Sequence, residues 1–167
     1  NSEYKGLYVM MEKLKRDTNR INIAKANDAN PADGGYILKI DKTSGEINPY
    51  TNTQEWAGDS YYTKDISFLS KYDTYGQLNN TDQLPIVQKS NGQENYILYE
   101  YPKSSNITRN QKKYIQDYFH SFESALAGDD FKDPNKGYAA YIDTDSFVDF
   151  LIFNELANNV DGYRIST

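Results

Sequence analysis

The sequence predicts an α+β fold, in which a β-rich first part is followed by a mostly helical last third. Stretches rich in aromatic and β-branched residues at 36–40 and 95–102 predict strands, because such side chains favour the extended backbone. Beyond Thr108, two longer stretches carry apolar residues at helical spacing. With 167 residues, the chain is long enough for one domain with a buried core.

The first 42 residues form the predicted β-rich part, a partial lobe. Its predicted strands are residues 4–14, 20–24 and 36–40, and the Asn-, Asp- and Gly-rich stretch 27–35 is a predicted loop. Residues 43–94 are polar, with few large apolar side chains, and predict an irregular insertion with one or two short strands. The strand at 95–102 opens the last part, 95–167, and ends at Pro102, which cannot donate a ladder hydrogen bond.

Two helices are predicted after this strand. Thr108 and Gln111 form a T-x-x-Q capping box, which predicts the start of the first helix, and Gly128 predicts its end. Its apolar positions are Ile115, Tyr118, Phe119, Phe122, Ala125 and Leu126. A short extended segment at 138–142 precedes a second helix, capped by Asp143 or Asp145 and ending near residue 158. Apolar residues cover most of its circumference, so we expect it to be the buried, central helix of its lobe.

Composition and charge exclude several function classes. The net charge is −6 and the 18 basic residues are scattered, which argues against a nucleic-acid groove or an anionic membrane surface as partner. No apolar run approaches the roughly 18 to 20 residues of a membrane span. The chain has no cysteine and a single histidine, His120, which excludes a thiolate nucleophile and a His-rich metal site. We therefore expect any chemistry to depend on carboxylates, with a hard ion such as Mg²⁺.

Asp161, in the "NNVDG" stretch that follows the second helix, has two interpretations. Asp-Gly is a common turn signal, so the residue could simply end the helix. A carboxylate near a helix C-terminus, however, faces the unfavourable end of the helix dipole, by a few tenths to about 1 kcal/mol. A tolerated misfit of this kind indicates function, and the local sequence leaves the turn and the catalytic carboxylate open.

Two other groups of acidic residues favour structural roles. Asp143, Asp145 and Asp149 could form a metal site, but the first two lie where carboxylates cap free helix N–H groups, and we favour capping. The "DKTSGE" stretch at 41–46 lacks the ligand spacing of a calcium loop, so a plain turn is favoured.

Six blocks of the sequence, in this order, resemble the CotH kinase family of spore-coat-type atypical protein kinases, in particular its members from gut bacteria. The blocks are "YKGLYVMMEK", "RINI", "GGYILKIDK", "YEYPK", "ITRNQKKYIQDYFHSFESAL" and "YIDTDSFVDFLIFNELANNVDGYRIST". The resemblance implies a partial, distant relative of the protein-kinase fold. It also implies a parent protein that uses ATP and Mg²⁺ to phosphorylate Ser or Thr of secreted or surface proteins, itself secreted or at the bacterial cell surface.

The resemblance also implies roles for single residues. Asp161 matches the catalytic-loop aspartate that accepts or orients the substrate hydroxyl. Met11 and Glu12 match the strand that runs into the nucleotide-binding hinge, near the adenine. Ser166 stands five residues after Asp161, where a kinase-type loop carries a metal-binding Asn, and is a weaker ligand.

Two features of the family have no counterpart among these residues. They are the upstream segment with its phosphate-contacting basic residue, and the D-x-D metal element expected after a strand that begins at Tyr163. We therefore expect a fragment, one domain truncated at both ends, that alone has no kinase activity and does not use ATP and Mg²⁺. The alternative is a non-catalytic surface or glycan-binding domain that binds through its tyrosine-rich insertion.

Overall fold

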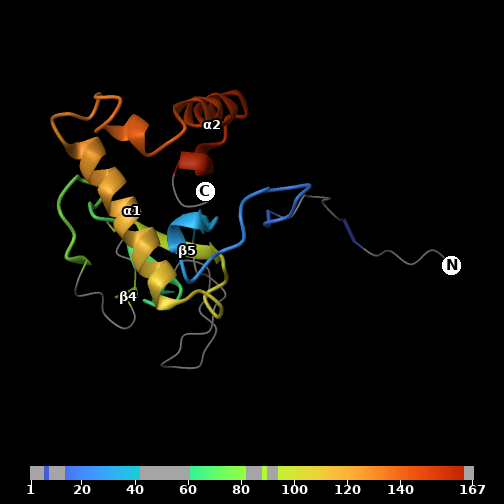
Figure 1. The fold of residues 1–167 in the computed structure, drawn as a ribbon. Coiled ribbons are helices and arrows are strands. Elements are labelled where there is room, and N and C mark those ends of the chain that lie inside the picture. The colour runs from blue at the N-terminus through green and yellow to red at the C-terminus, as the bar shows by residue number, and fades with distance from the viewer. Residues whose placement is uncertain (1–5, 8–13, 42–60, 82–87, 90–93, 164–167) are drawn as a thin grey trace.

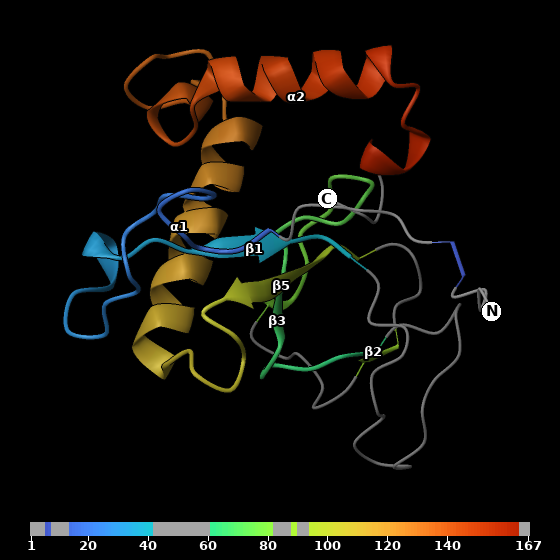
Figure 2. The ribbon, with the colours of Figure 1, turned by 90° about the vertical axis from the view of Figure 1, so that its right-hand side faces the viewer.

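The chain folds as an α+β structure in which one long helix covers a small antiparallel sheet and a second helix stands apart (Figure 1). The computed structural model describes residues 6–7, 14–41, 61–81, 88–89 and 94–163. The second helix lies beyond the C-terminal end of the first and runs transverse to it in Figure 2. The predicted fold class is confirmed.

The sheet has three strands in the order β1-β5-β3, and both pairings are antiparallel. The strands are β1 (Ile37–Lys39), β2 (Tyr61–Tyr62), β3 (Ser67–Leu69), β4 (Gln88–Lys89) and β5 (Tyr96–Tyr101), with β2 and β4 paired separately. The helices are α1 (Arg109–Ala127) and α2 (Thr144–Leu156), with short 3-10 turns η1 (Pro31–Asp33), η3 (Tyr138–Ala140) and η4 (Val160–Tyr163). Strands were predicted at 36–40 and 95–102, and β1 and β5 confirm them.

The central strand β5 is buried on both faces, because its side chains alternate between two apolar clusters. Ile97 and Tyr99 face the first cluster, with Phe68 of β3 and Ile115 of α1. Tyr96 and Leu98 face the second, where the rings of Tyr62 and Tyr96 stack with centroids 4.2 Å apart. β3, which lies inside the predicted 43–94 insertion, thus supplies Phe68 to the core.

Helix α1 begins as the sequence predicts. The Gln111 amide donates to the Thr108 hydroxyl oxygen at 3.3 Å, and the Thr108 amide donates to the Gln111 side-chain oxygen at 3.0 Å. These two bonds satisfy helix N–H groups that have no partner within the helix. The capping box is therefore confirmed, and it fixes the helix start directly after the buried Ile107.

Helix α2 forms where the sequence predicts it, but the prediction that it is a buried central helix is wrong for the described chain. The exposed fraction of its large apolar side chains ranges from 38 % at Phe150 to 81 % at Leu156. No described helix or strand covers this helix (Figure 2). Apolar residues all around a helix mean that burial would stabilise it, but whether the helix is buried depends on which elements pack against it. None of the helices in the described part of the chain is long and apolar enough to cross a membrane.

Three further local predictions differ from the structure. Residues 20–24 form no strand, because Ile21 makes only an isolated bridge to Arg16 and no neighbouring strand continues the pairing. The segment 138–142, which was expected to be extended, contains the 3-10 turn η3. The Tyr118 hydroxyl of α1 donates a 2.8 Å hydrogen bond to the carbonyl of Tyr141, the residue that follows this turn. Tyr163 belongs to η4 instead of starting a strand, and most of the predicted 4–14 strand lies outside the described residues.

Candidate functional site

The predicted catalytic residue, Asp161, lies on the 3-10 turn η4, which follows α2. The structure describes its backbone, while its side chain lies outside the described part. Met11, Glu12 and Ser166 also lie outside the described residues. The structure therefore does not place the four predicted site residues relative to one another, and the described part of the candidate site is the turn that carries Asp161.

The turn begins where α2 ends. Asn158 adopts a left-handed backbone with φ of 49°, a conformation that Asn tolerates better than most residues. Helix α2 ends at Leu156, and Asn158, two residues later, turns the chain towards η4. Asp161 therefore lies five residues beyond the last residue of the helix.

Asn154 connects α2 to this turn and is the buried residue of the helix, with an exposed fraction of 7 %. Its side-chain nitrogen donates to the Phe150 carbonyl at 2.8 Å, and its side-chain oxygen accepts from the Asn159 side-chain nitrogen at 2.9 Å. The Asn159 backbone amide also donates to the Asn154 carbonyl, at 2.9 Å. The carboxamide therefore has partners at both of its ends, as a buried polar group requires.

Gly162, directly after Asp161, packs against the same carboxamide. Its amide donates to the Asn159 carbonyl at 3.2 Å. A Cβ atom at this position would lie 1.9 Å from the Asn154 side-chain oxygen and 2.8 Å from the Asn159 side-chain nitrogen. Real Cβ atoms do not approach other atoms so closely, so a larger residue here would force the Asn154 carboxamide to move.

The comparisons with known proteins decide the family. The family model described as "CotH kinase protein" matches residues 1–167, the whole chain. The chain belongs to the CotH kinase protein family. Membership supports a kinase-like function in general, and a kinase family suggests ATP and metal use and a protein substrate. No curated protein and no solved structure matches the chain, so no structural neighbour shows a kinase-like fold.

The described residues of this CotH chain include no ready-made cluster of metal ligands. They contain no group of three or more His, Asp or Glu that could hold a metal ion. Asp143 is the N-cap of α2 and accepts from the Asp145 amide at 3.1 Å, which confirms its predicted capping role. His120 lies on α1 with its Nε2 2.8 Å from the Leu69 carbonyl oxygen, a contact that joins the helix to β3.

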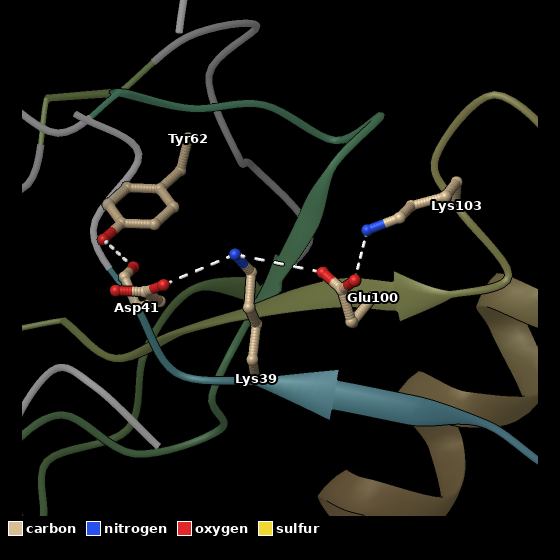
Figure 3. Close-up of polar contacts among 5 residues, drawn as sticks. All are labelled: Lys39, Asp41, Tyr62, Glu100 and Lys103. Carbon is tan, nitrogen blue, oxygen red and sulfur yellow. Dashed lines mark hydrogen bonds and ion pairs between the residues drawn. The ribbon is translucent and has the colours of Figure 1, made fainter. Parts of the chain in front are cut away.

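A second polar group of this CotH chain, the strand-edge cluster, joins β1 to β5 and was not predicted (Figure 3). The Lys39 ammonium lies 3.4 Å from an Asp41 carboxylate oxygen and 3.9 Å from a Glu100 carboxylate oxygen. Glu100 also pairs with Lys103, and the Tyr62 hydroxyl donates to the Asp41 carbonyl at 2.9 Å. Figure 3 shows Lys39 between the two carboxylates.

A bulge explains how Glu100 reaches Lys39. Ile37 is opposite Tyr101 and Leu38 is opposite Tyr99, so Glu100 is the extra residue on β5. With two lysines and two carboxylates, the cluster has no net charge to attract a phosphate, and the lysines are already paired. We interpret it as a connection between two strands.

Asn154 is the residue of the turn's contacts that the sequence does not predict. The available signal was a single Asn in a mostly apolar stretch of eight residues, "FLIFNELA". A carboxamide within an apolar helix needs hydrogen-bond partners if it is buried. The partners themselves could not be predicted, since they depend on how the chain turns after Leu156.

Proposed function

We propose that the protein containing this chain is a CotH-type kinase that transfers the γ-phosphoryl group of ATP to Ser or Thr hydroxyls of secreted or surface proteins. The observation that carries the proposal is the family match over residues 1–167. The geometry supports it at one place: the turn that carries Asp161 is built by specific contacts instead of fraying from the end of α2.

In phosphoryl transfer the protein supplies mainly position and charge neutralisation, and a catalytic-loop aspartate accepts or orients the substrate hydroxyl. We assign this role to Asp161. An aspartate with this role has to stand in the same position each time a substrate binds, so its backbone must be restrained. The contacts among Asn154, Asn159 and Gly162 restrain the backbone on both sides of it.

The nucleotide and the metal belong to the same proposal. Met11 and Glu12 are assigned to the adenine side of the site and Ser166 to the metal, with Mg²⁺ neutralising phosphate charge when it is bound. The proposal further places the protein outside the bacterial cell or at its surface.

A thermal-shift experiment on the intact protein tests the class of function. The kinase proposal predicts a rise in unfolding temperature with ATP and Mg²⁺, because a ligand that binds only the folded state stabilises it. A glycan-binding domain is the second candidate, favoured by tyrosine rings that the fold leaves exposed, such as Tyr75 and Tyr118. A shift with oligosaccharides, and none with ATP and Mg²⁺, would reject the kinase in favour of this candidate.

A further inference from the structure

We propose that Asn154 is a positioning residue of the kinase reaction: its carboxamide fixes the turn that carries Asp161. The inference rests on the proposed function for its catalytic part. Its structural part, that Asn154 holds the turn, stands on the contacts of the described residues alone.

Burial along α2 is the reverse of what polarity predicts. The large apolar side chains of the helix are 38–81 % exposed, while the polar Asn154 is only 7 % exposed. Burying a carboxamide is unfavourable unless its donor and acceptor groups find partners. The turn provides a hydrogen-bond partner through Asn159 and a close backbone contact through Gly162, so Asn154 joins the helix to the turn.

The two ends of the carboxamide have different tasks. The nitrogen donates to the Phe150 carbonyl, four residues earlier in the helix, which orients the side chain. The oxygen then points at the turn, where the Asn159 side chain donates to it. Loss of the oxygen would release the turn, whereas loss of the nitrogen would only loosen the orientation of the side chain.

Gly162 completes the restraint. The clash that a Cβ atom would make at this position, 1.9 Å from the Asn154 oxygen, shows that the backbone next to Asp161 rests on the carboxamide. Asp161 therefore stands between Asn159, which is hydrogen-bonded to Asn154, and Gly162, which packs on it. The same side chain thus contacts the chain on both sides of the proposed catalytic aspartate.

The test uses four variants of the intact protein. Asn154→Ala removes both ends of the carboxamide, and Asn154→Ser keeps an uncharged hydroxyl that can donate to the Phe150 carbonyl and still accept a hydrogen bond. Gly162→Ala introduces the clash, and the double variant Asn154→Ala/Gly162→Ala removes the atoms that the new Cβ would meet at Asn154. The matched control is Asn110→Ala, an identical chemical change at an exposed position in the first turn of α1.

Amide hydrogen exchange gives the structural readout. In Asn154→Ala we expect the Asn159 and Gly162 amides to exchange about tenfold faster or more, with α1 unchanged, because only the local opening of the turn becomes easier. Asn110→Ala should leave the turn amides at their wild-type rates. Wild-type exchange of the Asn159 and Gly162 amides in Asn154→Ala would overturn the structural part.

Kinetics give the catalytic readout. We expect Asn154→Ala to lower kcat about 10- to 100-fold with KM for ATP unchanged, because a misplaced catalytic group weakens the transition state and not nucleotide binding. Asn154→Ser should recover part of kcat, because its hydroxyl replaces part of the lost hydrogen bonding. The double variant should be no slower than Asn154→Ala, although Gly162→Ala alone is impaired, since contacting residues are not additive.

Each outcome decides a separate statement. If the wild-type protein transfers no phosphoryl group, the proposed function fails, while exchange still decides whether Asn154 holds the turn. If Asp161→Asn abolishes transfer but Asn154→Ala has wild-type kcat, the positioning role is overturned. Should Asn154→Ala fail to fold, Asn154→Ser decides. Turn exchange and kcat that change together, or that both stay near wild type, support the role, and a change in only one of the two contradicts it.

Discussion

Tyr96 and Tyr99 lie on the two faces of the central strand β5, and burial raises the pKa of both phenols above the usual value of 10. Desolvation is the largest cause for each, and at Tyr96 the charge of Glu94 adds to it. Because the folded state keeps a proton that the unfolded chain loses, the two phenols contribute stability that is complete below pH 10. That stability is lost as the pH rises above 10.

The expected loss can be calculated from this linkage. Between pH 10 and pH 11 an unfolded tyrosine becomes mostly ionised, which lowers the free energy of unfolding by about 1 kcal/mol for each buried phenol. The two together give about 2 kcal/mol, against a total of about 5–15 kcal/mol for a typical domain. Above pH 11 the slope steepens to about 1.4 kcal/mol per pH unit for each residue.

Urea unfolding at pH 9, 10 and 11 measures the effect, with Tyr96→Phe and Tyr99→Phe each expected to remove about half of the loss. At pH 9, Tyr96→Phe should be neutral or stabilising, because the Tyr96 hydroxyl is buried without a hydrogen-bond partner in the described structure. The control is Tyr75→Phe, at a side chain that is 73 % exposed. An equal loss in all three variants would refute the reasoning, since the loss would then not come from the buried phenols.

Three further predictions concern the helices and the strand-edge cluster. Thr108→Ala should lower the free energy of unfolding by about 1 kcal/mol and Thr108→Ser by much less, because only Ala removes the cap acceptor; equal losses in urea unfolding would contradict the cap. Lys39→Met should cost less than about 1 kcal/mol, because its ion pairs are partly exposed, and a larger loss in thermal unfolding would show that the cluster is a stronger connection. Phe153→Lys and Leu156→Lys should reduce both dye binding to apolar surface and self-association of the 167-residue chain, because both side chains project from α2 into solvent. The circular dichroism should not change, and unchanged dye binding would mean that α2 is covered.

The parts of the fold that depend on local sequence were predictable. The start of α1 follows from the Thr108 and Gln111 side chains, each of which accepts a hydrogen bond from the backbone amide of the other residue within one helical turn. The bounds of α2 follow in the same way from Asp143 and the apolar repeat. Residues 20–24 show the limit, because a strand exists only where another strand pairs with it, and Ile21 meets only Arg16.

The parts that depend on distant residues were not predictable. The exposure of α2 depends on what packs against it, and its composition gave the opposite expectation. The contact between Lys39 and Glu100 requires a bulge in β5 that no turn or composition signal marks. At the candidate site the sequence indicated Asp161, whereas Asn154, which builds its turn together with Gly162, became visible only through its contacts.

The most direct test of the account is transfer of the γ-phosphoryl group from radiolabelled ATP to protein Ser or Thr by the intact protein, compared with its Asp161→Asn variant. Asp149→Asn is the matched control, because it neutralises another carboxylate close by, on the exposed surface of α2. We predict transfer by the wild-type protein, near wild-type transfer by Asp149→Asn, and a loss of about 100-fold or more in Asp161→Asn. Undiminished transfer by Asp161→Asn, or no transfer by the wild-type protein with Mg²⁺ present, would contradict the account.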